Sequence, residues 1–325
     1  MLQFAVTEDS SVGMNTDITY RVFGEKAELA VADAKTELSR LENKLSRFIP
    51  DSEISKINLF AGKGHVKISC ETYEVLSFAL LLSEISEDLF DITVGPLIDL
   101  WDYKHSFHVP EKAKIQSALF KVNFRDLLLN SQDKTACLRK AGQSIDLGGI
   151  GKGYASDRFI KILQEHGVSS AFINIGGNVS TLGKKSDGSP WSVGIRHPRR
   201  DNCLLGAVKV TSKAVVTSGD YERYFIDSTG ERQHHILNPV TGYPAESGLI
   251  SVTVVNDNAM IADALSTAIF VAGIDKGFEY LEQFPGAEAV LVDNRQQVFI
   301  TQGLKECYQT AEGIKVNMIW KEHAK

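Results

Sequence analysis

The most constraining feature of this 325-residue chain is a glycine-rich segment near its middle. Residues 144–157 read Ser-Ile-Asp-Leu-Gly-Gly-Ile-Gly-Lys-Gly-Tyr-Ala-Ser-Asp, with four glycines among six consecutive residues. The pattern predicts a short strand at 144–147, a turn without side chains, and then an amphipathic helix. Because glycine has no Cβ, a bulky ligand can closely approach the N–H and C=O groups of such a turn. One cation, Lys152, lies between Asp146 and Asp157, so the segment predicts a site for a phosphorylated molecule.

Two common phosphate-binding patterns do not fit this segment. A P-loop requires a glycine five positions before its Gly-Lys pair and a Ser or Thr after it, and Asp146 and Gly153 stand there instead. A dinucleotide fingerprint that begins at Gly149 has Tyr154 where its third glycine belongs. The alternative, in which the glycines serve only tight packing of a turn, stays open.

The composition is that of an ordinary globular protein. Hydrophobic residues make up 43% of the chain and charged residues 23%, which is enough to bury a sizeable core. The net charge of −6 and the lack of a basic run argue against a nucleic-acid partner. The four cysteines form no C-x-x-C pair, so we expect reduced, buried thiols and neither disulfides nor a zinc site.

No apolar stretch is long enough to span a bilayer, and we expect no membrane-spanning segment. The first residues lack the basic and apolar regions of a signal peptide. These features predict a soluble chain, and they leave its compartment and its oligomeric state open.

Apolar residues at three- and four-residue steps predict helices in the first half of the chain. A long helix is expected over about 26–48, and Pro50 ends it. Asp51 is typical of the N-cap of a short helix that follows. A third helix is expected over 71–87.

Alternating apolar residues predict strands, most of them in the second half of the chain. The predicted strands cover residues 17–24, 171–175, 191–196, 207–211, 214–217, 224–227, 249–255, 289–292 and 298–301. Turn residues at 187–190 and 228–231 predict hairpins. Because no linker or repeat divides the chain, we predict an α+β fold class with mixed antiparallel sheets and packed helices, in one integrated domain over residues 1–325.

A second candidate site lies on a predicted helix from Asn258 to Phe270. Asp263 and Thr267 are four residues apart and share one face of this otherwise apolar helix. A carboxylate and a hydroxyl are hard oxygen ligands suited to Mg²⁺, which keeps waters and substrate phosphates as its other ligands. A structural pair, in which Thr267 bonds back to the carbonyl of Asp263, is the alternative.

A third group of polar residues lies in two segments, 218–225 and 234–244. Tight turns at Asn-Pro and Thr-Gly accompany Tyr221 and His235, which the predicted strands place nearby. A lone histidine is more often structural than catalytic, and no Ser/His/Asp or Cys/His pattern is present. The Gly-Gly pair within 174–178 permits either close approach of a ligand or a turn.

Seven motifs of this chain, all in register, resemble those of the ApbE family of FAD:protein FMN transferases. The motifs are Met14-Asn-Thr16, Phe90-Asp-Ile-Thr-Val-Gly-Pro96, the Asp146 to Asp157 segment, Gly176-Gly-Asn178, Ser218-Gly-Asp-Tyr-Glu-Arg-Tyr224, His235-Ile-Leu-Asn-Pro-Val-Thr-Gly242 and Ala262-Asp-Ala-Leu-Ser-Thr267. The resemblance runs from about Met14 to Phe270 and beyond. Asn238 stands where the family more often has Asp.

The resemblance implies a Mg²⁺-dependent transfer of the FMN half of FAD onto a Thr or Ser of a partner protein, with release of AMP. It implies an ApbE-like, T-fold-related architecture and an acceptor that is a respiratory or redox flavoprotein subunit. It also implies that Asp263, Thr267 and the backbone carbonyl of Gly149 hold Mg²⁺. Asp263 or His235 would accept the proton of the attacking hydroxyl.

The resemblance further implies that FAD is lined by residues from the first six of these motifs. These are Met14, Phe90, Asp91, Thr93, Asp146, Lys152, Asp157, Gly177, Ser218, Tyr221, His235 and Ile236. Two other functions stay open at this point. The protein could be a FAD pyrophosphatase, in which water replaces the acceptor hydroxyl, or a FAD-binding protein without catalysis.

Overall fold

The computed structural model describes residues 6–319. Residues 1–5 and 320–325, which include part of the N-terminal segment without signal features and both ends of the predicted domain, lie outside the described residues. A nine-stranded sheet runs in the order β1-β2-β6-β7-β10-β13-β14-β15-β17. Its strands are β1 (Val6–Gly13), β2 (Thr16–Phe23), β6 (Ser170–Ile175), β7 (Asn178–Leu182), β10 (Ala214–Gly219), β13 (Leu249–Asn256), β14 (Glu288–Asp293), β15 (Val298–Thr301) and β17 (Val316–Ile319). The strands pair antiparallel except β15 with β17.

Smaller sheets and helices complete the part of the chain from 6 to 319. The small sheets contain β3 (Val66–Lys67), β5 (Thr135–Leu138) and β4 (Leu127–Asn130); β16 (Tyr308–Thr310), β9 (Leu204–Val210) and β8 (Trp191–Arg196); and the hairpin β11 (Tyr224–Ile226) with β12 (Arg232–His234). The helices are α1 (Ala27–Leu45), α2 (Glu53–Leu59), α3 (Cys70–Ile85), α4 (Gly95–Trp101), α5 (Lys112–Leu119), α6 (Gly151–Glu165), α7 (Ala259–Ala272) and α8 (Ile274–Gln283), with 3₁₀ turns at Phe124–Asp126 and Gln302–Leu304.

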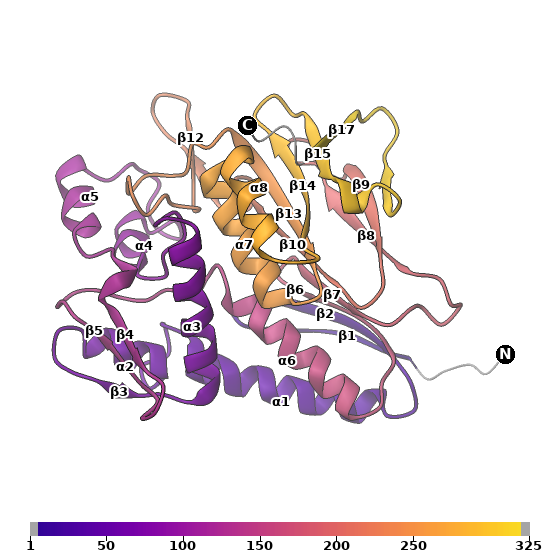
Figure 1. Ribbon diagram of the computed structural model, residues 1–325, viewed down its shortest axis with the longest axis horizontal. Coiled ribbons are helices and arrows are strands. Elements are labelled where there is room, and N and C mark those ends of the chain that lie inside the picture. Colours follow the sequence, from indigo (N-terminus) through magenta and orange to yellow (C-terminus); the bar gives the residue numbers. More distant parts are fainter. Residues whose placement is uncertain (1–5, 320–325) are drawn as a thin grey trace.

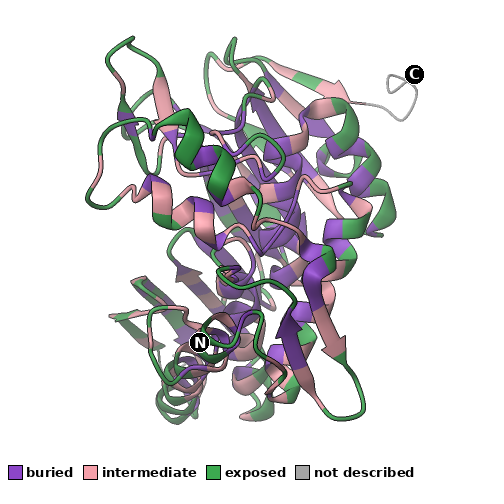
Figure 2. Ribbon diagram, turned by 90° about the vertical axis from the view of Figure 1, so that its left-hand side faces the viewer, coloured by how far each residue is buried: buried purple, intermediate pink, exposed green. Residues whose placement is uncertain are grey.

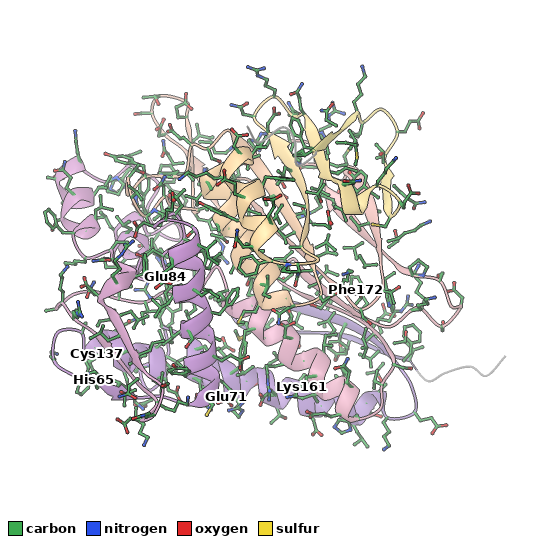
Figure 3. The ribbon with its side chains drawn as sticks, in the orientation of Figure 1. His65, Glu71, Glu84, Cys137, Lys161 and Phe172 are labelled. Carbon is green, nitrogen blue, oxygen red and sulfur yellow. The ribbon has the colours of Figure 1, made fainter. Side chains whose placement is uncertain are left out.

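The large sheet is covered on both faces. Helices α1 and α6 pack on β2 and β6, while α7 and α8 pack on β10, β13 and β14 (Figure 1). The sheet β16-β9-β8 covers part of the other face, and Phe172 of β6 reaches toward it, with its ring 5.7 Å from that of Trp191 (Figure 3). Ala289 and Leu291 therefore face the helices, whereas Val290 and Val292 face the second sheet. Figure 2 shows the buried residues concentrated between these layers.

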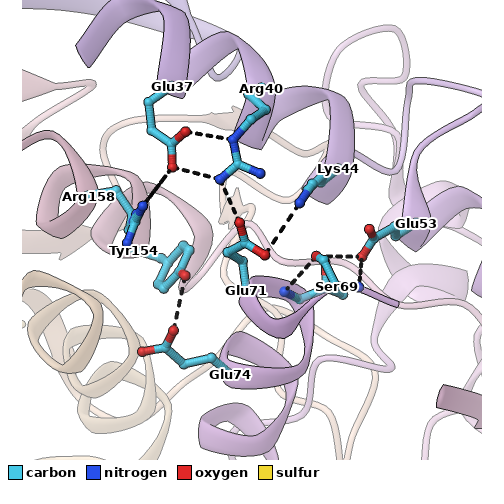
Figure 4. Close-up of polar contacts among 10 residues, drawn as sticks. Glu37, Arg40, Lys44, Glu53, Ser69, Glu71, Glu74, Tyr154 and Arg158 are labelled. Atoms are coloured by element: carbon cyan, nitrogen blue, oxygen red, sulfur yellow. Dashed lines mark hydrogen bonds and ion pairs between the residues drawn. The ribbon is translucent and has the colours of Figure 1, made fainter. Parts of the chain in front are cut away.

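Half-buried ion pairs join α1, α3 and α6 (Figure 4). Glu37 of α1 accepts hydrogen bonds from Arg40 at 2.6 Å and from Arg158 of α6 at 3.1 Å. Arg40 also donates to Glu71 of α3 at 2.6 Å. Burial works to raise the pKa of Glu71, but hydrogen bonds from its own backbone N–H and from Arg40 lower it to about 2. These contacts attach α1 to both α6 and α3.

The predicted fold class, α+β with mixed antiparallel sheets and packed helices, is confirmed. The hairpin predicted at 228–231 joins β11 to β12. The predicted helix after Asn258 is α7, and the side chain of Asn258 caps it by accepting from the N–H of Ile261. Within residues 6–319, no helix is long and apolar enough to cross a membrane.

The strand predicted at 144–147 is wrong, because only Ser144 forms an isolated bridge there, to Val94. The segment is extended, but a side chain takes the place of a second partner strand. Asn58 of α2 donates to the carbonyl of Ile145 at 3.1 Å and accepts from its N–H at 2.7 Å. The N–H of Asp146 donates to the carbonyl of Ile92 at 2.8 Å.

Three further local predictions are wrong. Ser52, and not Asp51, caps α2 by accepting from the N–H of Ser55. The predicted long helix ends at Leu45 and not near residue 48. The hydroxyls of Ser52 and Ser55 donate to the carbonyl of Ser46, the residue that follows this helix. The turn at 187–190 joins strands of different sheets and makes no hairpin.

The four thiols are free, as predicted, but they are not all buried. Cys137 is buried on β5 (Figure 3), whereas Cys70 and Cys203 are exposed.

Candidate active site

The glycine turn is held in place by the side chains on either side of it. Asp146 accepts the N–H of Gly148 at 2.7 Å through one carboxylate oxygen, and the other oxygen lies 3.2 Å from Nη1 of Arg47. Nζ of Lys152 donates to the carbonyl of Gly148 at 3.0 Å and lies 3.8 Å from Oδ1 of Asp263. The ammonium group of Lys152 therefore links the turn to α7. Its position shows that the Gly148 carbonyl and the Asp263 carboxylate together attract positive charge.

The first turn of α6 lies directly against α7. The N–H of Gly153 donates to Oδ2 of Asp263 at 2.8 Å. A Cβ on Gly153 would come within 2.3 Å of the carbonyl oxygen of Ala259 and 2.7 Å of Cβ of Asp263. Only glycine allows this approach without a shift of one helix. The contact leaves Asp263 buried, at 3% exposure, with Oδ2 committed to the backbone of α6 and Oδ1 facing Lys152.

The two other predicted metal ligands lie beside each other. A Cβ on Gly149 would be 3.2 Å from Oγ1 of Thr267 and 3.4 Å from the ring of Phe90. Oγ1 of Thr267 is also 3.3 Å from Oγ of Ser218 and 3.5 Å from the carbonyl of Asp263. The distance of 3.5 Å is at the outer limit of a hydrogen bond. A bond from Thr267 back to the carbonyl of Asp263, the alternative to metal binding, is therefore weak.

The donor atoms gathered here fit Mg²⁺. A carboxylate oxygen, a hydroxyl and the backbone of a side-chain-free turn are all hard oxygen donors, and a lysine ammonium already lies against the carboxylate. Within the described chain, no three His, Cys, Asp or Glu side chains group in a way that could hold a metal. A metal here would therefore rely on a single carboxylate, with water or substrate oxygens completing its ligands.

The hairpin tips that carry Met14 and Gly177 meet at one end of the large sheet. Met14 and Asn15 form the turn between β1 and β2, with φ values of 53° and 58°. Gly176 and Gly177 form the turn between β6 and β7. A Cβ on Gly176 would lie 2.4 Å from Oγ1 of Thr16, so the tips are in contact and glycine is required there.

Asp91 and Thr93 are buried, and their polar atoms bind their own surroundings. One Asp91 oxygen accepts from the N–H and the hydroxyl of Thr93, at 2.6 and 2.7 Å, and the other from the N–H of Phe124 at 2.8 Å. Oγ1 of Thr93 in turn accepts from the N–H of Asn123 at 2.8 Å. Burial raises the pKa of Asp91 to about 6, although these hydrogen bonds lower it. Both side chains shape the segment that carries Phe90.

The His235 loop supplies a neutral imidazole. Nδ1 of His235 lies 3.2 Å from the carbonyl of Arg223, which can only accept, so Nδ1 carries the proton and Nε2 is the free acceptor. Burial lowers the pKa of His235 to about 3, and the charges of Arg223 and Lys152 add to this. The next residue, Ile236, is buried, while Tyr221 packs its ring on Gly219.

His234, which sequence patterns did not single out, is a second buried neutral histidine. Its Nδ1 accepts from the N–H of Ile236 at 3.3 Å, and its Nε2 lies 3.1 Å from the carbonyl of Ala245. These partners determine the tautomer, because Nδ1 must be unprotonated to accept. Burial lowers the pKa of His234.

We expect stability to fall as the pH drops below about 6.5, because the unfolded chain then binds protons that folded His234 does not. The loss approaches about 1.4 kcal/mol per pH unit for each such histidine. Denaturant unfolding at pH 7.5 and 5.5 should show a smaller loss for His234→Gln than for the wild type. Equal losses would contradict the neutral assignment.

Arg47 and Asn58 contact the segment of the candidate site, and sequence patterns do not reveal them. Arg47 is only 9% exposed and joins Asp146 to Asp99, from whose carboxylate its Nη2 lies 2.7 Å. Asn58 holds the chain just before the glycine turn through Ile145. For Asn58, the only signal in the sequence is that a polar residue follows the apolar pair Ile54 and Ile57. For Arg47 there is no signal, because no sequence pattern connects positions 47 and 146.

Comparison with known proteins agrees with this arrangement. A model of the ApbE family matches residues 14–291. The FAD:protein FMN transferase of Klebsiella pneumoniae is 32% identical over 294 residues, which cover 90% of each chain, and that of Treponema pallidum is 33% identical over 85% of this chain and 80% of the relative. The crystal structure of the ApbE protein from Thermotoga maritima is similar with a TM-score of 0.85 and 34% identity, over 93% of this chain and 99% of that one. This chain therefore belongs to the ApbE family.

Proposed function

We propose that this protein transfers the FMN half of FAD onto a Thr or Ser hydroxyl of a partner protein, in a Mg²⁺-dependent reaction that releases AMP. The hydroxyl oxygen bonds to the phosphorus on the FMN side, and the anhydride P–O bond breaks. AMP leaves with the electron pair of that bond, and the hydroxyl proton passes to a base or to water. Flavin transfer is the activity for which the Klebsiella and Treponema relatives are named.

The observation that carries the proposal is the meeting of α6 and α7 at Gly153 and Asp263. It brings a glycine turn with a lysine, a helix N-terminus, one carboxylate and one hydroxyl to the same place. A pyrophosphate needs positive charge and N–H donors along its oxygens, and a turn that leads into a helix provides both. Gly149, Asp263 and Thr267 are the residues that would hold Mg²⁺.

Bound Mg²⁺ would neutralise charge on the phosphate oxygens as the anhydride is cleaved. Lys152 would contribute a second positive charge at the same oxygens, because its ammonium is already directed at the Asp263 side of the turn. Nε2 of His235 and the carboxylate of Asp263 are the candidate proton acceptors. A neutral imidazole whose pKa is about 3 is a weak base, so it would take the proton late, after bond formation to phosphorus has begun.

The flavin would lie along the remaining residues of the seven motifs. We propose that Phe90, Tyr221 and Ile236 provide apolar surface for the flavin. The hairpin tips that carry Met14 and Gly177 would lie at the far end of the flavin site. Asp146 would hold the glycine turn in place through its contacts with the N–H of Gly148 and with Arg47. Asp91 and Thr93 would act indirectly, through the segment that carries Phe90, because their polar atoms are already bonded.

The test is incubation of the full chain with FAD, Mg²⁺ and an acceptor subunit of a respiratory flavoprotein, beside that subunit with its acceptor Thr replaced by Val. We expect the acceptor to gain the mass of FMN, AMP to form in equal amount, and this chain to keep its own mass. Free FMN and AMP with an unmodified acceptor would show a pyrophosphatase instead. FAD that stays bound and intact after Mg²⁺ addition would show a binding protein.

A further inference from the structure

Asp157 of α6 binds the end of a different helix. Its Oδ1 accepts from the N–H of Ala259 at 2.8 Å, and its Oδ2 accepts from the N–H of Met260 at 2.9 Å. These are the first two N–H groups of α7, which have no partner within their own helix. The third, from Ile261, is bonded at 2.9 Å by Asn258, the N-cap residue of α7. Two side chains thus cap one helix, one belonging to α7 and one to α6.

Asp157 and Gly153 attach α7 to α6 at two levels. They are four residues apart on α6 and therefore lie on one face, one turn from each other. Gly153 donates to Asp263, while Asp157 accepts from Ala259 and Met260, which lie about one turn earlier on α7. Two attachments at different heights prevent both sliding and rotation of α7. Figure 1 shows one end of α7 next to α6, with the strands of the large sheet behind the two helices.

The orientation of α7 determines whether the proposed metal ligands converge. Asp263 and Thr267 belong to α7, whereas Gly149 lies just before α6. A rotation of α7 by one residue position would turn the Asp263 carboxylate away from the glycine turn. Each oxygen of Asp157 is bonded to a backbone N–H group of α7, so this carboxylate is directed at that helix.

We propose that Asp157 is a positioning residue, which fixes α7 against α6 so that Asp263 and Thr267 face Gly149. This inference rests on the proposed function, because it assumes a metal at those three residues. It differs from the role that the family resemblance implied, in which Asp157 lines FAD. Asp157 is half-buried, and burial raises its pKa to about 6 although the two N–H groups lower it.

The matched pair Asp157→Ala and Asn258→Ala tests the inference in the full chain. Each variant removes a cap from the same helix end, so we expect similar shifts of the unfolding midpoint. Metal binding is measured by the electron paramagnetic resonance of free Mn²⁺, without FAD. Asp157→Ala should raise the Mn²⁺ dissociation constant by about tenfold or more, as loss of a supporting contact around a metal site commonly does. Asn258→Ala should change it by less than about twofold, since it leaves the attachment to α6 intact.

Two further measurements separate positioning from other roles. With Asp157→Ala, saturating Mg²⁺ should restore kcat while the KM for FAD stays unchanged. Asp157→Asn, which keeps one carbonyl oxygen as acceptor, should give an intermediate Mn²⁺ affinity. This variant replaces Asp157→Ala in the test if the alanine variant does not fold. Equal Mn²⁺ affinities of Asp157→Ala and Asn258→Ala, or a raised dissociation constant for FAD alone, would overturn the inference. A wild type that binds neither Mn²⁺ nor Mg²⁺, with or without FAD, would instead refute the metal-dependent function.

Discussion

Replacing Asp263 by asparagine should reduce metal-dependent flavin transfer by roughly a thousandfold while the protein stays folded. Asp263 is the one carboxylate on the proposed metal-binding face, and its Oδ1 faces the glycine turn. The asparagine keeps an oxygen that can accept from the N–H of Gly153, a contact that now measures 2.8 Å. Loss of charge, and not loss of packing, is therefore the main change. Steady-state transfer rates over a range of Mg²⁺ concentrations measure the effect.

Asp263→Ala should be equally inactive but less stable, because it leaves the buried N–H of Gly153 without a partner, at a cost of about 1–3 kcal/mol. Ser266→Ala is the control on the same helix. Ser266 is buried and bonds the Asp263 carbonyl at 2.8 Å, but it is not among the proposed ligands. Wild-type turnover by Asp263→Asn at millimolar Mg²⁺ would remove Asp263 from the metal site.

Gly153→Ala should destabilise the protein by about 3 kcal/mol and weaken metal binding as well. The new Cβ would lie 2.3 Å from the carbonyl oxygen of Ala259, a backbone atom that can move only if a helix moves. Separation of the helices would also break the hydrogen bond from Gly153 to Asp263. Denaturant unfolding and Mn²⁺ titration measure the two effects.

Gly151→Ala is the matched control for this prediction. Gly151 is in the same first turn of α6, but the nearest atom to its added Cβ is Cβ of Leu147 at 3.7 Å, an ordinary contact. Alanine favours a helix over glycine by up to about 1 kcal/mol, so this variant should be as stable as the wild type or more so. If both alanine variants unfolded at the wild-type midpoint, the close approach of α6 to α7 at position 153 would be disproved.

The sequence by itself determined the features that depend on neighbours along the chain. The spacing of Asp263 and Thr267 placed a carboxylate and a hydroxyl on one face of α7, because an α-helix returns to the same face every three to four residues. The four glycines marked the turn before α6 and the first turn of α6 itself in the same way, since they remove side chains whatever packs against them. Motifs of this local kind were also enough to suggest the family.

Only the tertiary structure decided which polar groups remain free. Asp91 and Asp157 are both motif carboxylates, yet the fold supplies their oxygens with N–H or hydroxyl donors from Thr93, Phe124 and the first turn of α7. Asn58 took the place of the strand partner expected beside Ile145, and Arg47 reached Asp146 from 99 residues away in the chain. Sequence spacing carries no record of such pairings, because a hydrogen bond or ion pair depends on distance in space, and that distance is set by how helices and strands pack.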